Sequence, residues 1–190
     1  MILQAGGLGA MSLSDLIFHL GQWLRTTPMT EISLAIQKSR LTELIDGTFW
    51  VLPLIQSLHI MAIAATFGSV LMINLRIFQL AGRSRTMTET VRRYLPWVWW
   101  GLLALVVTGI GMIFSDPVRE FTNAIFWFKM ILVIVAALVT LCFQGSVRRN
   151  VARWEQTGAG RTLIRAGAGA VIALWCLIML AGRWIAYAPT

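Results

Sequence analysis

The stretch that decides the fold is residues 52–77, which read LPLIQSLHIMAIAATFGSVLMINLRI. Residues 47–75 contain no Asp, Glu, Lys or Arg. A helix needs about 20 apolar residues to cross a bilayer at ~1.5 Å per residue, so this segment is long enough to span a membrane. Three further stretches are apolar: 94–115, 121–147, whose one charged residue is Lys129, and 166–182, which is followed by Arg183.

The four apolar segments predict an all-α integral membrane protein with a four-helix bundle. The spans are expected at about residues 49–76, 94–115, 121–147 and 165–187. The transmembrane domain then covers residues 47–190, and residues 1–46 lie outside the bilayer.

The composition supports a membrane protein. Of the 190 residues, 57% are hydrophobic and 13% charged, and the mean hydropathy is +0.73. Average soluble domains carry about 25% charged residues, so this composition excludes a soluble enzyme and a disordered tail. The net charge of +8 would suit a nucleic-acid binder, but the charges fall in short stretches between apolar runs, a pattern typical of membrane topology.

Basic residues are concentrated in the first and third connections between the spans. The first contains Arg76, Arg83, Arg85, Arg92 and Arg93, and the third contains Arg148, Arg149, Arg153, Arg161 and Arg165. Basic loops face the cytoplasm. We therefore expect a multi-pass protein of the bacterial inner membrane with both termini extracytoplasmic.

Aromatic residues fit the same frame. The expected interfacial belts are Trp97, Trp99 and Trp100 on the inner side and Trp50, Trp127, Trp184 and Tyr187 on the outer side. Trp and Tyr prefer the headgroup level. Lipid anchoring is therefore expected of these residues before any role in stacking on a cofactor.

The first 46 residues predict two amphipathic helices. From Leu13, apolar residues recur at helical spacing as far as Leu24, and Pro28 ends the pattern. Residues 30–45 predict a second short helix. Residues 1–10 lack the basic start and apolar core of a signal peptide, and Met11 is an alternative start. The first helix is expected to lie on the membrane surface or to cap the bundle.

Three ionisable residues lie inside the predicted spans: His59, Lys129 and Arg183. Counted from the arginine at the cytoplasmic end of the same helix, they lie 17, 19 and 18 residues away, or roughly 25–29 Å. They are therefore expected at one depth, toward the extracytoplasmic side. At that level the second span carries Gly109 and Gly111, which leave room for a flat group or for close helix packing.

His59 has a functional and a structural interpretation. It is either an axial ligand to haem or copper or a proton-transfer group, or else a buried neutral imidazole bonded to Thr or Ser. Its helix face also carries small and polar residues: Gln56, Ala62, Thr66 and Ser69. The third span has a similar stripe, with Thr122, Ala136 and Thr140 in steps of three or four from Lys129. The two stripes could face each other inside the bundle.

Lys129 and Arg183 also have two interpretations. They either extend to the outer headgroups or pair with carboxylates, which a haem presents as two propionates. No acidic residue lies in the spans to pair with them, so an anionic ligand is an expected partner.

The strings LPLIQSLHIMAIAATFGSVLMINLRI, LPWVWWGLLALVVTGIGMIFSDP, FWFKMILVIVAAL and AGRWIAY, within residues 52–187, resemble a group of small four-helix bacterial membrane proteins. Its better-known relatives are the copper-resistance D family and the J-type protoporphyrinogen oxidase. The resemblance implies that His59 ligates a b-type haem and that Lys129 is the cation of the site. After Arg76 this chain reads IFQLAG and lacks the oxidase's second histidine, a departure that argues against protoporphyrinogen oxidation.

The leading hypothesis is a membrane redox protein, either a haem-dependent oxidoreductase or an electron-transfer subunit, with haem b held by His59, Lys129 and Arg183. The second axial ligand would be Lys129, a methionine or a residue of a second copy, or the position is open. The expected partners are the lipid bilayer, a redox partner or quinone, and a homo-oligomer or larger membrane complex, but no nucleic acid.

Two alternatives remain open. Transport of copper or of an anionic or quinone-like molecule is one, although copper would favour Met or Cys pairs and Met61 and Met72 have no close partner in the sequence. Cys142 and Cys176 are far apart and are expected to be buried, inert thiols. The other alternative is a non-catalytic membrane subunit that anchors a partner.

Overall fold

The computed structural model describes residues 13–82, 84–156 and 158–185. The described chain is all-helical, with 88% helix and no strand. Its helices are α1 (Leu13–Arg25), α2 (Met29–Gln37), α3 (Arg40–Asp46), α4 (Val51–Ile77), α5 (Met87–Ser115), α6 (Pro117–Thr122), α7 (Ala124–Gln156) and α8 (Gly158–Trp184).

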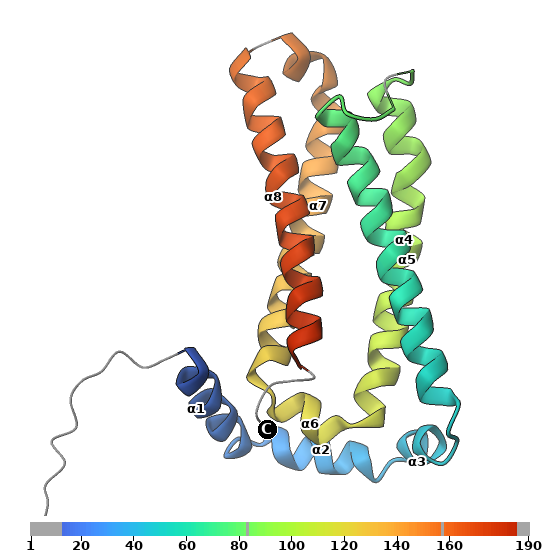
Figure 1. The fold of residues 1–190 in the computed structure, drawn as a ribbon, viewed down its shortest axis with the longest axis vertical. Helices are drawn as coiled ribbons and strands as arrows, with labels where there is room; N and C mark the ends of the chain where they lie inside the picture. The colour runs from blue at the N-terminus through green and yellow to red at the C-terminus, as the bar shows by residue number, and fades with distance from the viewer. Residues whose placement is uncertain (1–12, 83, 157, 186–190) are drawn as a thin grey trace, which may run out of the picture.

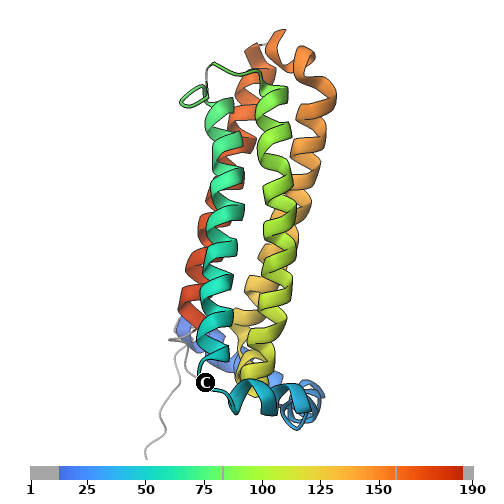
Figure 2. The same ribbon diagram turned by 90° about the vertical axis from the view of Figure 1, so that its right-hand side faces the viewer.

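Four segments of the described chain are long and apolar enough to cross a membrane: Val51–Ile77, Met87–Ser115, Ala124–Cys142 and Thr162–Trp184. They confirm the predicted four-helix bundle and define a multi-pass membrane protein. α4 packs chiefly against α5 and α7 chiefly against α8, and α4 meets α8 between these two hairpins. In Figure 1 the ribbons of the two hairpins diverge toward the end where α2 and α6 lie. Figure 2 shows the same bundle turned about its long axis, with the four long helices running side by side.

Polar caps set where two of the spanning helices begin. α5 starts at Met87, seven residues before the predicted boundary, because Thr86 and Glu89 form a capping box. The Glu89 N–H donates to Thr86 Oγ1 at 3.3 Å, and the Thr86 N–H donates to Glu89 Oε2 at 3.0 Å. α7 starts at Ala124, where Asn123 Oδ1 accepts the Ile125 N–H at 2.9 Å.

Small residues bring α4 and α5 into close contact. Thr66 is fully buried, and a Cβ added to Gly101 would overlap its hydroxyl. The buried stripe on α4 is confirmed for Ala62, Thr66 and Ser69, whereas Gln56 is exposed. The expectation that this stripe faces the third span is wrong for Thr66, because Gly101 of α5 offers a closer approach than a helix with side chains could.

The core lies where the two hairpins meet. Buried apolar side chains from all four spanning helices form one cluster: Val70, Val98, Ala136, Val171, Trp175 and Ile178. The predicted stripe of the third span contributes Ala136 and the buried Thr140 from α7. Thr122 is buried too, but its predicted place on the same helix is wrong, because it ends α6 and α7 begins at Ala124. The cluster holds the hairpins together by apolar packing.

A layer of short helices covers one end of the bundle. α1 contacts α6 and α7, α2 contacts α6, and α3 contacts α4 and α5, so these helices lie across the ends of the spans (Figure 1). The single helix predicted for residues 30–45 is wrong. Ser39 accepts the Thr42 N–H and starts a new helix, which splits the segment into α2 and α3.

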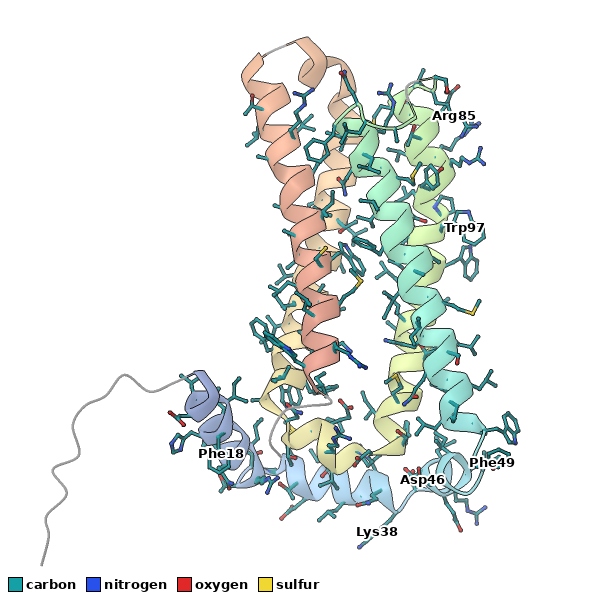
Figure 3. The ribbon with its side chains drawn as sticks, viewed as in Figure 1. Phe18, Lys38, Asp46, Phe49, Arg85 and Trp97 are labelled. Atoms are coloured by element: carbon teal, nitrogen blue, oxygen red, sulfur yellow. The ribbon has the colours of Figure 1, made fainter. Side chains whose placement is uncertain are left out.

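The surface of the bundle is apolar, as a lipid-facing surface must be. In Figure 3, Trp97 points away from α5 and Phe49 points away from the chain just before α4, and both are exposed. Exposure also fits the predicted belts at Trp50, Trp99, Trp100 and Trp184. Cys142 is exposed, so its predicted burial is wrong: it lies on the outward face of α7. Met11 and Tyr187 lie outside the described residues.

Candidate functional site

His59 projects from α4 toward α5 and is half-buried. Its Nδ1 lies 2.7 Å from Thr108 Oγ1, and the Thr108 hydroxyl lies 2.6 Å from the Ala104 carbonyl oxygen, to which it donates. Since that hydroxyl proton is already donated to Ala104, Thr108 Oγ1 accepts the hydrogen bond from the His59 Nδ1–H. The hydrogen-bond network thus assigns the Nδ1–H tautomer and leaves the lone pair of the ring on Nε2.

The partner that the structural interpretation expected, a Thr hydroxyl, is therefore present. The same bond would also orient a metal-binding histidine. In such residues one ring nitrogen donates a hydrogen bond and the other binds the metal. The contact with Thr108 fits both interpretations and fixes which nitrogen is available.

The glycines of α5 at this level have different surroundings. A Cβ added to Gly109 would lie 3.8 Å from His59 Cε1, so the imidazole lies along bare backbone. A Cβ at Gly111 would lie 3.2 Å from Ile55 Cδ1. Gly111 therefore serves helix packing, and only Gly109 borders the histidine.

Lys129 lies against α8. A Cβ added to Gly182 would lie 3.6 Å from both Cε and Nζ of Lys129, so the lysine side chain lies along the backbone of α8 immediately before Arg183. Arg183 itself is exposed in the last turn of α8. The two cations predicted at one depth are thus brought to the same end of the second hairpin.

Lys129 also connects the two hairpins electrostatically. Its ammonium is close enough to act coulombically on the His59 ring and on the Glu120 carboxylate. Lys129 therefore lies within coulombic range of His59 across the bundle. Their roles as cofactor ligands stay a prediction.

Glu120 was missed by the sequence reasoning, because it lies in a connection and not in a span. Burial raises the pKa of the Glu120 carboxyl, and the Lys129 ammonium opposes that rise. The available signal was Asp116 followed by Pro117, a typical helix start. Asp116 caps α6 through the Arg119 N–H, and α6 carries Glu120 back toward the first turns of α7.

Metal-ligand chemistry at this site rests on few groups. Within residues 13–82, 84–156 and 158–185, no cluster of three or more His, Cys, Asp or Glu side chains is placed to hold a metal ion. In a haem the iron already has the four nitrogen ligands of the porphyrin, so the protein needs to supply only one or two axial ligands. His59 Nε2 is the one imidazole nitrogen offered at this level of the described chain.

These features define a small four-span membrane protein with an imidazole and two cations near one end of its bundle. The chain belongs to DUF6644, a family of unknown function, whose family model matches residues 43–188. No curated protein matches the chain, and no solved structure matches it. The family match covers all four spans and begins within α3.

Proposed function

We propose that this protein is a membrane redox protein that binds a b-type haem between its helices near the extracytoplasmic side and serves electron transfer. The observation that carries the proposal is the hydrogen bond from His59 Nδ1 to Thr108 Oγ1 at 2.7 Å, which orients Nε2 as a ligand. When bound, a b-type haem supplies one-electron chemistry at its iron.

The donor set fits such a group. His59 would supply the axial imidazole, held in orientation by Thr108. Lys129, which lies along the α8 backbone at Gly182, and Arg183, the next residue of α8, would bind the two propionates, since a charge-assisted hydrogen bond to a carboxylate is stronger than a neutral one. The bare backbone at Gly109 would let a flat ring approach α5 beside the imidazole. The resemblance to the copper-resistance D family and J-type protoporphyrinogen oxidase supports the same assignment.

The proposed orientation in the membrane follows from the distribution of positive charge. The α4–α5 and α7–α8 connections lie at one end of the bundle, and α1, α2, α3 and α6 lie at the other (Figure 1). The connections carry the arginine clusters, so we place that end in the cytoplasm of a bacterial inner membrane and both termini outside. Labelling of single cysteines introduced at Lys38 and at Arg85 with an impermeant maleimide, in the Cys142→Ser, Cys176→Ser background, tests this placement. In intact cells we expect the reagent to label the cysteine at position 38 and not the one at position 85. Labelling at position 85 and not at position 38 would overturn the placement.

Absorption spectroscopy tests the proposal directly. The full chain is produced with haem supplied, purified in detergent and scanned before and after dithionite. We expect a Soret band that shifts on reduction. The band should be lost in His59→Ala and kept in the matched control His19→Ala, because His19 is the other histidine of the chain and is exposed on α1.

Two results would overturn the assignment. One is the absence of a Soret band from a folded chain, and the other is a band that His59→Ala leaves unchanged. Helical circular dichroism and a single gel-filtration peak establish that each variant is folded.

A further inference from the structure

Three buried polar atoms have no hydrogen-bond partner within the described part of the chain: Asn74 Oδ1, Thr140 Oγ1 and Trp175 Nε1. Their side chains are 2%, 3% and 3% exposed. A buried polar group without a partner is unfavourable, and native proteins rarely leave one so. Three in one small bundle call for a common explanation.

Two contacts between other residues of these helices let the levels of Asn74, Thr140 and Trp175 be counted along the bundle. Lys129 lies against Gly182 across α7 and α8. Because these helices are antiparallel, eleven residues along α7 lead to Thr140 and eleven back along α8 lead to Val171.

The same counting applies between α4 and α8. Phe78 lies against Gly169, so four residues back along α4 lead to Asn74 and four forward along α8 lead to Ala173. Thr140 and Asn74 thus lie opposite residues 171 and 173. Trp175 follows two residues later, and long helical side chains lean toward the N-terminus of their own helix, which for Trp175 is toward residue 171. The three levels fall within about 6 Å of helix rise.

The three side chains also face the same interior. Val70, one turn before Asn74, and Ala136, one turn before Thr140, belong with Val171 and Trp175 to a single buried cluster. α4, α7 and α8 therefore bring Asn74, Thr140 and Trp175 to one face of the core.

The unused hydrogen-bonding capacity of these groups is complementary. The Asn74 amide already donates through Nδ2 to the Val70 carbonyl at 3.0 Å, so its Oδ1 needs a donor. The Trp175 indole N–H needs an acceptor, and the Thr140 hydroxyl can play either part. A ligand that suits all three must be small and uncharged and must both donate and accept.

We propose that Asn74, Thr140 and Trp175 form an internal water site between the two hairpins. The water donates to Asn74 Oδ1, accepts from Trp175 Nε1–H and completes its bonds with Thr140 Oγ1, which is the number of partners that buried waters normally have. It links α4 of the first hairpin to α7 and α8 of the second. The site thereby sets the spacing of the hairpins on the cytoplasmic side of His59, and it does not depend on a bound cofactor.

Nuclear magnetic resonance on the full chain, labelled with ¹⁵N-tryptophan in detergent micelles, tests the site. The Trp175 indole resonance is assigned by its loss in Trp175→Phe. We expect a cross-peak between this indole proton and water in the wild type, and its loss in Thr140→Val or Asn74→Leu. Thr90→Val is the matched control, because Thr90 is buried but donates to the Thr86 carbonyl, and it should leave the cross-peak unchanged.

Thermal unfolding of Thr140→Val gives a second readout. Valine has the shape of threonine, so it lowers the unfolding temperature if the hydroxyl binds water and raises it if the hydroxyl has no partner. A wild-type indole without a water cross-peak, or a raised unfolding temperature in Thr140→Val, would overturn the proposal.

Discussion

His59 on α4 and Thr108 on α5 are joined by a hydrogen bond of 2.7 Å between Nδ1 and Oγ1. Forty-nine residues separate them in the chain, and the bond forms because α4 and α5 are antiparallel neighbours. The donation of Thr108 to the Ala104 carbonyl fixes the direction of this bond. The pair therefore determines both the orientation and the tautomer of the single imidazole among the spans.

We predict that Thr108→Val weakens both the fold and the site. Loss of the bond to a half-buried imidazole should reduce the free energy of unfolding by about 0.5–1.5 kcal/mol. If His59 ligates haem, loss of its orienting partner should weaken haem binding by about 10- to 100-fold. Thermal unfolding and titration of the Soret band measure the two effects. Thr108→Ser keeps the hydroxyl and should restore both, and a Ser variant as impaired as Val would contradict this account.

We predict that Gly101→Ala separates α4 from α5. The added Cβ would overlap the Thr66 hydroxyl, and overpacking of this kind costs about 1–3 kcal/mol. Gly68→Ala is the matched control, since a Cβ there has nothing within 4 Å and alanine favours a helix over glycine. Differential scanning fluorimetry should show a lower unfolding temperature for Gly101→Ala but not for Gly68→Ala. Adding Thr66→Ala to Gly101→Ala should partly restore the unfolding temperature.

We predict that Glu120 makes stability depend on pH. Burial raises the pKa of this carboxyl in the folded protein, so folding favours its protonated form. The stability it contributes is fully present below the usual Glu pKa of about 4.3 and is lost as pH rises through the raised value. Unfolding temperatures measured from about pH 4 to about pH 7 should therefore increasingly favour Glu120→Gln over the wild type.

Lys129→Met should steepen the pH dependence contributed by Glu120. The Lys129 ammonium opposes the rise in the pKa of Glu120, so its removal leaves the half-buried carboxylate without that compensation. Parallel pH curves for the wild type and Glu120→Gln would contradict the placement of Glu120 in a half-buried position.

We predict that Asn123 joins the start of α7 to the end of α8. Its Oδ1 accepts the Ile125 N–H at 2.9 Å, and its Nδ2 donates to the Ile185 carbonyl at 3.5 Å. Asn123→Ala should cost about 1–2 kcal/mol of unfolding free energy. Asn123→Asp keeps the helix cap and loses the donor to Ile185, so its loss in a thermal melt should be smaller. An equal loss would place the whole contribution in the bond to α8.

Residue order alone determined the four spans, because long apolar stretches with at most one charge have few stable alternatives to a membrane helix. It also determined that His59, Lys129 and Arg183 lie in spans, since depth along a helix follows from counting residues. It misplaced the start of α5, where Thr86 and Glu89 extend the helix beyond the apolar run. It also missed the break at Ser39, where a side-chain cap outweighs amphipathic periodicity.

Only the tertiary structure decided which residues become neighbours across helices. The sequence gives no rule for how the faces of four similar apolar helices are rotated, because every face is apolar enough to meet lipid or protein. Thr108 as the partner of His59, the coulombic effect of Lys129 on Glu120, and the burial of Asn74, Thr140 and Trp175 all depend on that rotation. The depth of a polar residue in this protein is a property of the chain, and its partner is a property of the packing.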